Sequence, residues 1–457
     1  MTTELKRFLD SKQIAVKPAG FKVDRDLVTS QAFEFQRDCV VWGCKKGKAA
    51  FFQDCGLGKT LQQLLWASLV HQHTGRNVLI FAPLAVSQQT AREGDKFGVP
   101  VTIVRSQSDV KPGVNIANYE MIEHFHPSGF AGIVLDESSI LKGDGPMRRA
   151  ITDFSSTIPY RLACTATPAP NDHMELGNHA EFLGIMSKTE MLSTFFVHDG
   201  GDTSKWRLKG HAEAAFWKWV ASWAVMIRKP SDLGYSDEGF ALPALRYHQH
   251  TVAAEWSSDY LFPVEAKSMQ ERQAARRDSI EGRAKLAAEL VNGSKEQWLL
   301  WTNLNDEGEE LKRLIPDCVR VMGADSDKHK EQAPQDFISG KIRVLESKPK
   351  ILGWGMNFQN CHNAAAVGLS DSWESLYQIT RRIWRFGQKR ECHMHLICGE
   401  LEGAVSRNVE RKENQAAAMA AEMLGYMREI NTAEIHGTIR EQETYRAKER
   451  METPSWL

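Results

Sequence analysis

The stretch AAFFQDCGLGKTLQQLLW, residues 49–66, decides the fold of this chain. It begins with a short apolar run, passes through a turn with two glycines, and ends in a segment with helical apolar spacing. A strand, a glycine-containing loop and a helix in that order form a phosphate-binding turn, because loop N–H groups and the helix N-terminus face one point. Gly56 and Gly58 are the predicted cradle, Lys59 the contact to the outer phosphates, and Thr60 a ligand of Mg²⁺.

One position departs from the general phosphate-loop pattern. The pattern G-x-x-x-x-G-K-[ST] has Gly where this chain has Gln53, which indicates a subclass of the motif. The alternative is a tight glycine turn that leaves Lys59 in solvent. Agreement of the strand, the loop and the helix favours phosphate binding.

A second apolar run, GIVLDESS, ends in the carboxylates Asp136 and Glu137. Asp136 is predicted to hold Mg²⁺, directly or through water, and Glu137 to polarise an attacking water. An acidic pair after a strand is often only solvated. The phosphate loop upstream is what favours the metal-binding and catalytic interpretation here.

Short apolar runs recur along the chain and alternate with segments of helical spacing. This rhythm is typical of buried strands in a parallel sheet with right-handed crossovers, and it appears twice. The predicted strands are 49–52, 77–83, 101–105 and 132–137 in the first half, and 297–303, 318–323, 342–347 and 364–370 in the second. The predicted divisions are an extension at 1–30, a first lobe at 31–190, a Trp-rich helical insertion and linker at 191–284, a second lobe at 285–405, and a helical tail at 406–457.

Composition limits the class of protein. The 457 residues include 57 Lys and Arg and 58 Asp and Glu, giving a net charge of −1, with 42% hydrophobic residues. This excludes a wholly disordered chain and a uniformly basic nucleic-acid coat. No run approaches the roughly 18 apolar residues of a membrane span, and the charged beginning lacks an export signal. Eight scattered cysteines without a C-x-x-C pair indicate a reduced protein, so we expect cytoplasmic localisation and no membrane partner.

Four segments in order resemble the motor motifs of superfamily-two helicases and translocases: DCGLGKT (54–60), DESSILK (136–142), LACTATPAPN (162–171) and QITRRIWRFGQ (378–388). Within that group they are most similar to Swi/Snf-type DNA-dependent ATPases. The resemblance covers roughly 31–405. It implies an α/β fold of two tandem RecA-like lobes, with ATP and Mg²⁺ bound between them. It also implies DNA as the partner, duplex or branched, held mainly through its backbone.

The resemblance implies roles for further residues. It implies that Gln36 contacts the adenine edge, and that Thr165 and Thr167 couple the ATP site to the DNA site. The segment GWGMNFQNC (353–361) resembles a glycine-rich loop that approaches DNA or nucleotide closely, and Ser347 matches a Ser or Thr at the preceding strand end. The DNA-contact and coupling residues implied in this way are Ser87, Gln88, Tyr119, Thr165, Thr167, Ser347, Gly353, Gly355 and Asn357.

The last motif fits the spacing Q-x-x-x-R-x-x-R-x-G-Q at Gln378, Arg382 and Arg385. Charge accumulates on a transferring γ-phosphate, and guanidinium groups from a facing lobe can neutralise it. The two arginines are three positions apart, so a helix can direct both one way. The alternative is a solvated basic helix end or a generic phosphate-backbone patch. The order of the motifs favours arginines that reach the nucleotide when the lobes close, with Gln378 also on the nucleotide.

The sequence therefore predicts an enzyme that hydrolyses ATP, with Lys59, Glu137, Arg382 and Arg385 as catalytic groups, and that moves on DNA. The resemblance suggests a bacterial or phage motor for DNA replication, recombination or repair, with partner proteins from those processes, in the host cytoplasm if phage-encoded. One alternative is an RNA helicase, although DEAD-box proteins carry H-R-x-G-R-x-x-R and D-E-A-D. Another is a DNA-binding adaptor with a vestigial nucleotide site, which conflicts with the intact residue set.

A cluster of metal-ligand types occurs in ECHMHLIC. Cys392, His393, His395 and Cys398 lie within seven residues, which raises the question of a zinc site. Strand alternation places Cys392 on the face opposite the two histidines, so a core strand is the favoured interpretation.

The second cluster is aromatic. Trp206, Trp217, Trp219 and Trp223 lie among basic residues and could stack on exposed bases, but their spacing favours packing of a helical subdomain. Farther on, the segment 404–424 reads as an amphipathic helix that docks on the second lobe or contacts a partner.

Overall fold

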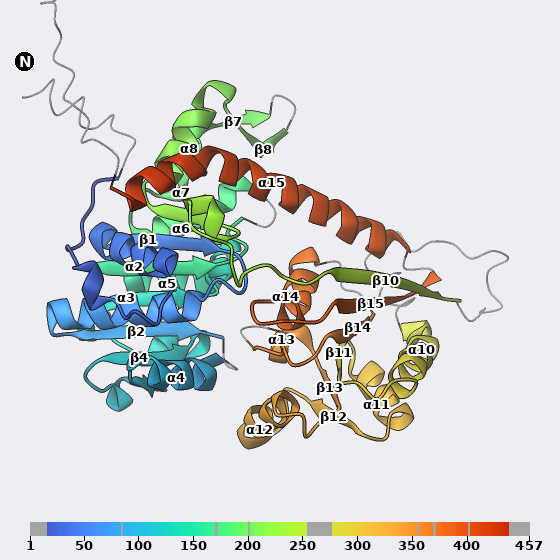
Figure 1. The fold of residues 1–457 in the computed structure, drawn as a ribbon. Helices are drawn as coiled ribbons and strands as arrows, with labels where there is room; N and C mark the ends of the chain where they lie inside the picture. Colours follow the sequence, from blue (N-terminus) through green and yellow to red (C-terminus); the bar gives the residue numbers. More distant parts are fainter. Residues whose placement is uncertain are drawn as a thin grey trace, which may run out of the picture.

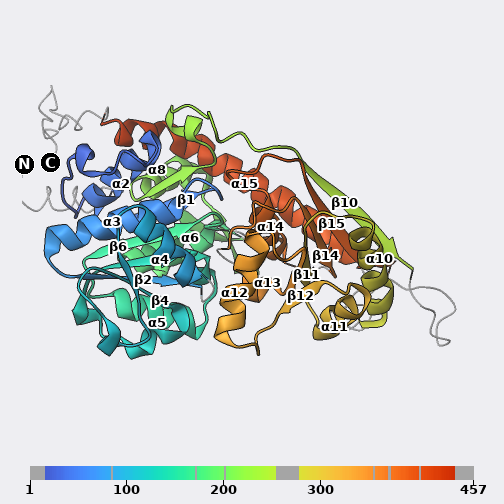
Figure 2. The same ribbon diagram turned by 60° about the horizontal axis from the view of Figure 1, so that its bottom comes forward.

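The fold of the chain is given by a computed structural model. It describes residues 16–83, 86–169, 172–199, 202–253, 277–353, 356–368, 372–400 and 403–437. Two parallel sheets, each flanked by helices, form two RecA-like lobes, as the sequence predicted (Figure 1). Lobe 1 denotes the first sheet with its helices, and lobe 2 the second. The lobes lie side by side, and one long helix runs across both (Figure 2).

Lobe 1 contains a seven-stranded sheet with the order β3-β4-β2-β5-β6-β1-β9, in which all the pairs are parallel. Its central strands are buried on both faces, which explains why they read as continuous apolar runs. The strands are β1 (Lys48–Gln53), β2 (Asn77–Ala82), β3 (Val101–Ile103), β4 (Val114–Asn118), β5 (Phe130–Asp136), β6 (Tyr160–Thr165) and β9 (Ala224–Ile227).

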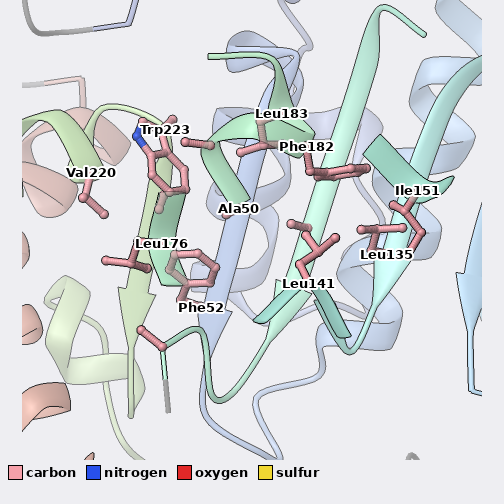
Figure 3. Packing of buried hydrophobic residues seen from close by; sticks show 14 of the residues in the cluster. Ala50, Phe52, Leu135, Leu141, Ile151, Leu176, Phe182, Leu183, Val220 and Trp223 are labelled. Carbon is pink, nitrogen blue, oxygen red and sulfur yellow. The ribbon is translucent and has the colours of Figure 1, made fainter. Parts of the chain in front are cut away.

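Helices cover both faces of the lobe 1 sheet. Alternate residues along β1 enter different core clusters: Phe52 packs on one face and Phe51 on the other. Figure 3 shows the first of these clusters, where Phe52, Leu176 and Trp223 pack together. The helices are α2 (Glu34–Lys46), α3 (Lys59–Thr74), α4 (Ser87–Lys96), α5 (Pro146–Ser155), α6 (Leu176–Leu183), α7 (Lys188–Phe195) and α8 (Glu213–Ala221).

The connection between the lobes contains more strand than the sequence predicted. A hairpin of β7 (Phe196–Asp199) and β8 (Asp202–Leu208) precedes α8, and β9 then joins the lobe 1 sheet beside β1. The strand β10 (Leu245–Val252) belongs to lobe 2. The run AVMI of β9 directly follows a helix of similar apolar character, and periodicity cannot separate a short buried strand from helix.

The tryptophans of this connection are core residues. Trp217, Trp219 and Trp223 are at most 1% exposed, and the rings of Trp219 and Trp223 meet edge to face at 5.4 Å. Trp206 packs partly buried against the same cluster. The packing interpretation is confirmed for the three buried rings, which cannot stack on nucleic-acid bases.

Lobe 2 contains a six-stranded parallel sheet with the order β10-β15-β14-β11-β13-β12. Besides β10, its strands are β11 (Trp298–Thr302), β12 (Cys318–Val321), β13 (Val344–Ser347), β14 (Asn363–Val367) and β15 (Cys392–Gly399). Its helices are α10 (Ile280–Asn292), α11 (Asn305–Leu314), α12 (Asp327–Ile338), α13 (Pro349–Leu352) and α14 (Trp373–Ile383).

The tail forms one long helix, α15 (Gly403–Ile435), which leaves lobe 2 and packs on lobe 1 (Figure 1). Asn431 is fully buried and donates to the carbonyls of Ala221 and Ala224, while its Oδ1 accepts from the N–H of Met226 at 3.1 Å. Near the end of the helix, Glu434 pairs with Lys46 at 2.9 Å. The predicted docking on the second lobe accounts for only part of its packing, since the helix contacts α14 and β15 of lobe 2 but packs mainly on lobe 1. The helix spans both lobes, because its Met face completes the apolar surface around α8.

All eight cysteines are free, and seven of them are buried. In the part of the chain that the structure describes, no helix combines the length and apolar character needed to cross a bilayer.

Candidate active site

The phosphate loop connects β1 to α3, as its sequence predicted. Gly56 and Gly58 adopt φ values of 91° and 74°, in the left-handed region that favours glycine. A Cβ on Gly58 would lie 2.3 Å from Nε2 of Gln36, and a Cβ on Gly56 would lie 2.8 Å from the backbone N of Phe386 in lobe 2. The loop is therefore tightly enclosed, and α3 begins directly after it at Lys59.

Gln53, the departure from the general motif, is the last residue of β1 and is fully buried. Its amide exchanges two hydrogen bonds with the amide of Gln62 on α3, at 2.8 and 2.7 Å. Gln62 Nε2 also donates to the carbonyl of Leu57 within the loop, at 3.1 Å. A glycine at position 53 would lack this side chain, so the amide pair explains how the loop is braced here.

Two further side chains contact the loop backbone. Lys59 Nζ donates to the carbonyls of Gln53 and Asp54 at 2.8 and 3.2 Å. Gln36 on α2 donates from Nε2 to the carbonyl of Leu57 at 2.9 Å, while its Oε1 accepts from the N–H of Phe33. Both residues thus lie at the loop, where the sequence places them.

The two carboxylates follow β5. Asp136 Oδ1 accepts from Gln63 Nε2 at 2.8 Å, and its backbone carbonyl accepts from the Tyr119 hydroxyl at 2.7 Å. Burial raises the pKa of Asp136 to about 6, with a further increase from the charge of Glu137. This is the environment of a carboxylate whose charged form a cation would stabilise.

Glu137 has a left-handed backbone, with φ 61° and ψ 59°. Among the described residues it is the only one other than glycine with positive φ, and such outliers cluster at functional sites. Its Oε1 accepts hydrogen bonds from Thr165 Oγ1 at 2.6 Å and from Ser139 Oγ at 3.2 Å. Thr165 therefore fixes the orientation of this carboxylate.

Lobe 2 contributes the arginines. Arg382 and Arg385 each donate to the backbone carbonyl of Met356, at 3.0 and 3.1 Å. Burial, together with the neighbouring charge of Arg382, lowers the pKa of Arg385 to about 10. Gln378 is buried behind them and accepts from Arg382 Nη2 at 2.9 Å, so it positions an arginine rather than lining the cavity.

A cavity of about 550 Å³ lies between the lobes, within the usual range for ligand sites. It brings together groups that are more than 300 residues apart in sequence. The predicted site residues around it are Gln36, Gly56, Gly58, Lys59, Thr60, Asp136, Glu137, Asn357, Arg382 and Arg385.

The residues present fit Mg²⁺ bound together with nucleotide phosphates. Thr60 and Asp136 supply the oxygen donors that Mg²⁺ prefers, and they line the same cavity as Lys59. A divalent cation there would stabilise the charged form of a carboxylate whose pKa is now raised.

The predicted DNA-contact residues of lobe 1 are spread out. Ser87 begins α4 and is buried, whereas Gln88 beside it is exposed. Tyr119 is 6% exposed and bonds to the Asp136 backbone, so in this conformation it supports the carboxylates rather than presenting its hydroxyl to a ligand. Thr167 is buried and its hydroxyl donates to Glu374 Oε1 of lobe 2 at 3.5 Å.

In lobe 2, Ser347 is fully buried and donates to the carbonyl of Val321 at 2.8 Å, so its side chain cannot contact DNA here. Gly353 directly follows α13, and a Cβ on it would lie 2.3 Å from the carbonyl oxygen of Pro349. Asn357 lies on the cavity between the lobes. Gly355 lies outside the described residues.

The Cys and His side chains of β15 separate as alternation predicted. Cys392 is fully buried in the core cluster of lobe 2, whereas His393 and His395 share the other face with His248 and His250 of β10. Within the described residues, no three His, Cys, Asp or Glu side chains converge as a metal site.

Sequence reasoning missed two groups of contacts. Gln63 donates to Asp136 and lies one helical turn after Lys59 on α3. Its role becomes visible only when β5, the strand that carries Asp136, is placed beside α3. The ion pair between Asp54 and Arg381 joins the two lobes at 2.8 Å. Asp54 and Arg381 carry opposite charges in two separate motifs, but the sequence does not indicate that they form a pair.

Comparisons with known proteins find similarity only among solved structures. No family model matches the chain, and no curated protein matches it. Among solved structures, it is similar to the Sulfolobus solfataricus SWI2/SNF2 ATPase core in complex with double-stranded DNA, at a TM-score of 0.40 and 16% identity. That match covers 91% of this chain and 98% of the other. The two lobes follow independently from the strand order and pairing of this chain.

Proposed function

We propose that this protein hydrolyses ATP to ADP and phosphate at the cavity between its lobes, and that DNA stimulates the reaction. One observation carries the ATPase proposal. A phosphate loop and a carboxylate pair from lobe 1 share a cavity with two arginines from lobe 2. Each set is common by itself, but their convergence on one cavity is what phosphoryl transfer to water requires.

Lobe 1 would bind ATP and orient the water. Loop N–H groups and the start of α3 would hold the phosphates, and Lys59 would exchange its two carbonyl contacts for phosphate oxygens. Thr165 and Ser139 both donate to Oε1 of Glu137. The other carboxylate oxygen, Oε2, would therefore orient the attacking water. Water would attack the γ-phosphorus as the bond between phosphorus and the bridging oxygen breaks. The electron pair of that bond would leave with ADP, and Oε2 of Glu137 would accept the proton that the water loses.

Lobe 2 would stabilise the transition state. Arg382 and Arg385 face the cavity and would neutralise charge that develops on the γ-phosphate. Mg²⁺, held through Thr60 and Asp136, would supply electrostatic stabilisation of the phosphate oxygens. Gln36 at the loop would contact the base. Gln378 would act through Arg382.

DNA as the stimulating partner rests on the order and spacing of the motor motifs, especially Q-x-x-x-R-x-x-R-x-G-Q. Opening and closing of the lobes in each ATP cycle would shift the grip on duplex or branched DNA. Thr165 touches Glu137, and Thr167 touches lobe 2, so this segment connects the water-orienting group to lobe movement. We place such a motor in bacterial or phage DNA replication, recombination or repair, with protein partners from those processes.

Phosphate release tests this function with purified protein and ATP. Separate reactions contain no nucleic acid, duplex DNA, single-stranded DNA, branched DNA or RNA. We expect stimulation by duplex or branched DNA that weakens as salt increases, because backbone contacts release counterions. Stimulation by RNA alone would identify an RNA helicase. Nucleic-acid binding without turnover under any condition would identify an adaptor.

A further inference from the structure

The helix α14 carries two functional faces. Arg382 on α14 and Arg385 just beyond the end of this helix line the cavity between the lobes. Glu374, Tyr377 and Arg381 lie three and four positions apart, on a shared helical face, and all three contact lobe 1. The motif spacing that predicts the two cavity arginines specifies none of these three residues.

One carboxylate of lobe 1 receives two of these contacts. Arg381 Nη2 lies 2.8 Å from Asp54 Oδ2, and the Tyr377 hydroxyl donates to Asp54 Oδ1. The side chains of Arg381 and Asp54 are only 8% and 13% exposed. The Arg381 guanidinium also lies 4.4 Å from the ring centre of Trp384, which holds it in place. Removing one partner from a pair this well buried and bonded costs much more stability than removing one partner from a surface pair.

Asp54 is also part of the phosphate loop. Its Oδ1 accepts from the N–H of Cys55 at 2.7 Å, and its backbone carbonyl accepts from Lys59 Nζ at 3.2 Å. Asp54 therefore joins the loop lysine, the first turn of the loop, and the helix that carries Arg382. A change in the position of Lys59 would therefore alter the contacts of Asp54.

The first turn of α14 makes a second contact with lobe 1. Glu374 is 7% exposed, forms an ion pair with Lys142, and accepts from Thr167. Lys142 follows the carboxylate pair, and Thr167 follows the strand that carries Thr165. The helix is thus fixed at both ends of its docking face, which sets the approach of its other face to the nucleotide cavity.

We propose that Asp54, Tyr377 and Arg381 form an interlobe latch that positions Arg382 and Arg385 opposite the phosphate loop. This inference deepens the proposed ATPase function and rests on it. The latch residues are positioning residues, since they act through α14 and do not reach the cavity arginines directly. Loss of the latch would leave nucleotide binding by lobe 1 intact and misplace the groups that act in the transition state.

Steady-state kinetics test the latch. In Arg381→Ala we expect kcat to fall about 10- to 100-fold, since displacements of about 1 Å at a reacting centre have effects of that order. The KM for ATP should stay within about threefold, because the phosphate loop and Lys59 are unchanged. Arg381→Lys should recover part of kcat, and Tyr377→Phe should show a smaller loss. The matched control is Arg313→Ala, which removes an exposed ion pair with Glu310 within lobe 2.

Small-angle X-ray scattering of the nucleotide-free protein separates the latch from the ATPase function. We expect a larger radius of gyration in Arg381→Ala than in the wild type and in Arg313→Ala. If the wild type hydrolyses no ATP, the proposed function fails, but the scattering still tests the latch. Wild-type kcat and wild-type scattering in Arg381→Ala would overturn the latch. So would a KM increase that accounts for the whole loss of kcat/KM.

Discussion

The two lobes hold their parts of the site in different ways. In lobe 1, side chains from the same lobe fix the carboxylates: Gln63 bonds to Asp136, and Thr165 bonds to Glu137. In lobe 2, both cavity arginines donate to one backbone carbonyl, that of Met356. Their placement relative to the phosphate loop depends on how α14 docks across the interface.

This difference indicates that the two lobes would contribute to different steps, lobe 1 to binding and lobe 2 to the transition state. Under the proposed function, lobe 1 would bind nucleotide whether or not the lobes are closed. Lobe 2 would contribute groups whose effect depends on closure, and interactions that form only in the transition state raise kcat rather than affinity. Changes in lobe 1 and lobe 2 should therefore have distinct kinetic signatures.

The largest expected effect concerns lobe 2. Arg385→Ala should lower kcat about 10³-fold, because a guanidinium that neutralises transition-state charge contributes at least that much. Nucleotide affinity, measured by titration with a fluorescent ATP analogue, should change little. Arg385→Lys should remain impaired, since an ammonium group lacks the planar donor geometry. Near-normal turnover in Arg385→Ala would show that Arg385 of lobe 2 takes no part in the chemistry. The proposed difference between the two lobes would then be wrong.

A smaller effect concerns the stability of lobe 1. His179 on α6 is fully buried, with Nε2 3.1 Å from Ser138 Oγ, beside the carboxylate segment. Burial lowers the pKa of His179 to about 4, against an ordinary value of 6.5. Below pH 6.5 the unfolded chain binds a proton that the folded chain does not. Folding stability should therefore fall as the pH drops from 6.5 towards 4, by about 3 kcal/mol in total.

Urea unfolding at a series of pH values measures this dependence. His179→Gln should unfold with a shallower dependence on pH than the wild type between pH 6.5 and 4. The matched control is His126→Gln, which replaces an exposed histidine of the same lobe. An unchanged slope in His179→Gln would show that this histidine titrates alike in the folded and unfolded chains.

The smallest effect concerns the tail. Asn431→Ala should destabilise lobe 1 by about 2 kcal/mol, because the carbonyls of Ala221 and Ala224 and the N–H of Met226 lose a buried partner. Unfolding followed by the fluorescence of the lobe 1 tryptophans measures this change. Glu429→Ala, at an exposed position of the same helix, serves as the control. Equal stability of the two variants would mean that α15 contributes nothing to lobe 1 through Asn431.

Local sequence was informative where a feature depends on consecutive residues. The strand, the glycine loop and the helix around Lys59 form one continuous segment, and β5 with Asp136 and Glu137 forms another. Sequence was less informative for β9, whose four apolar residues follow a tryptophan-rich helix without a change of composition. It was incomplete for α15, because an amphipathic face does not indicate that the helix will also cover lobe 1.

The sequence by itself determined two parallel α/β sheets and the chemical groups of the candidate ATP site, because periodicity, glycine turns and motif spacing are local properties. Only the tertiary structure decided that Gln53 braces the phosphate loop, that Gln63 holds Asp136, and that Arg381 meets Asp54. Each of these contacts joins separate elements. Their geometry depends on how strands and helices pack, which no single stretch of sequence specifies.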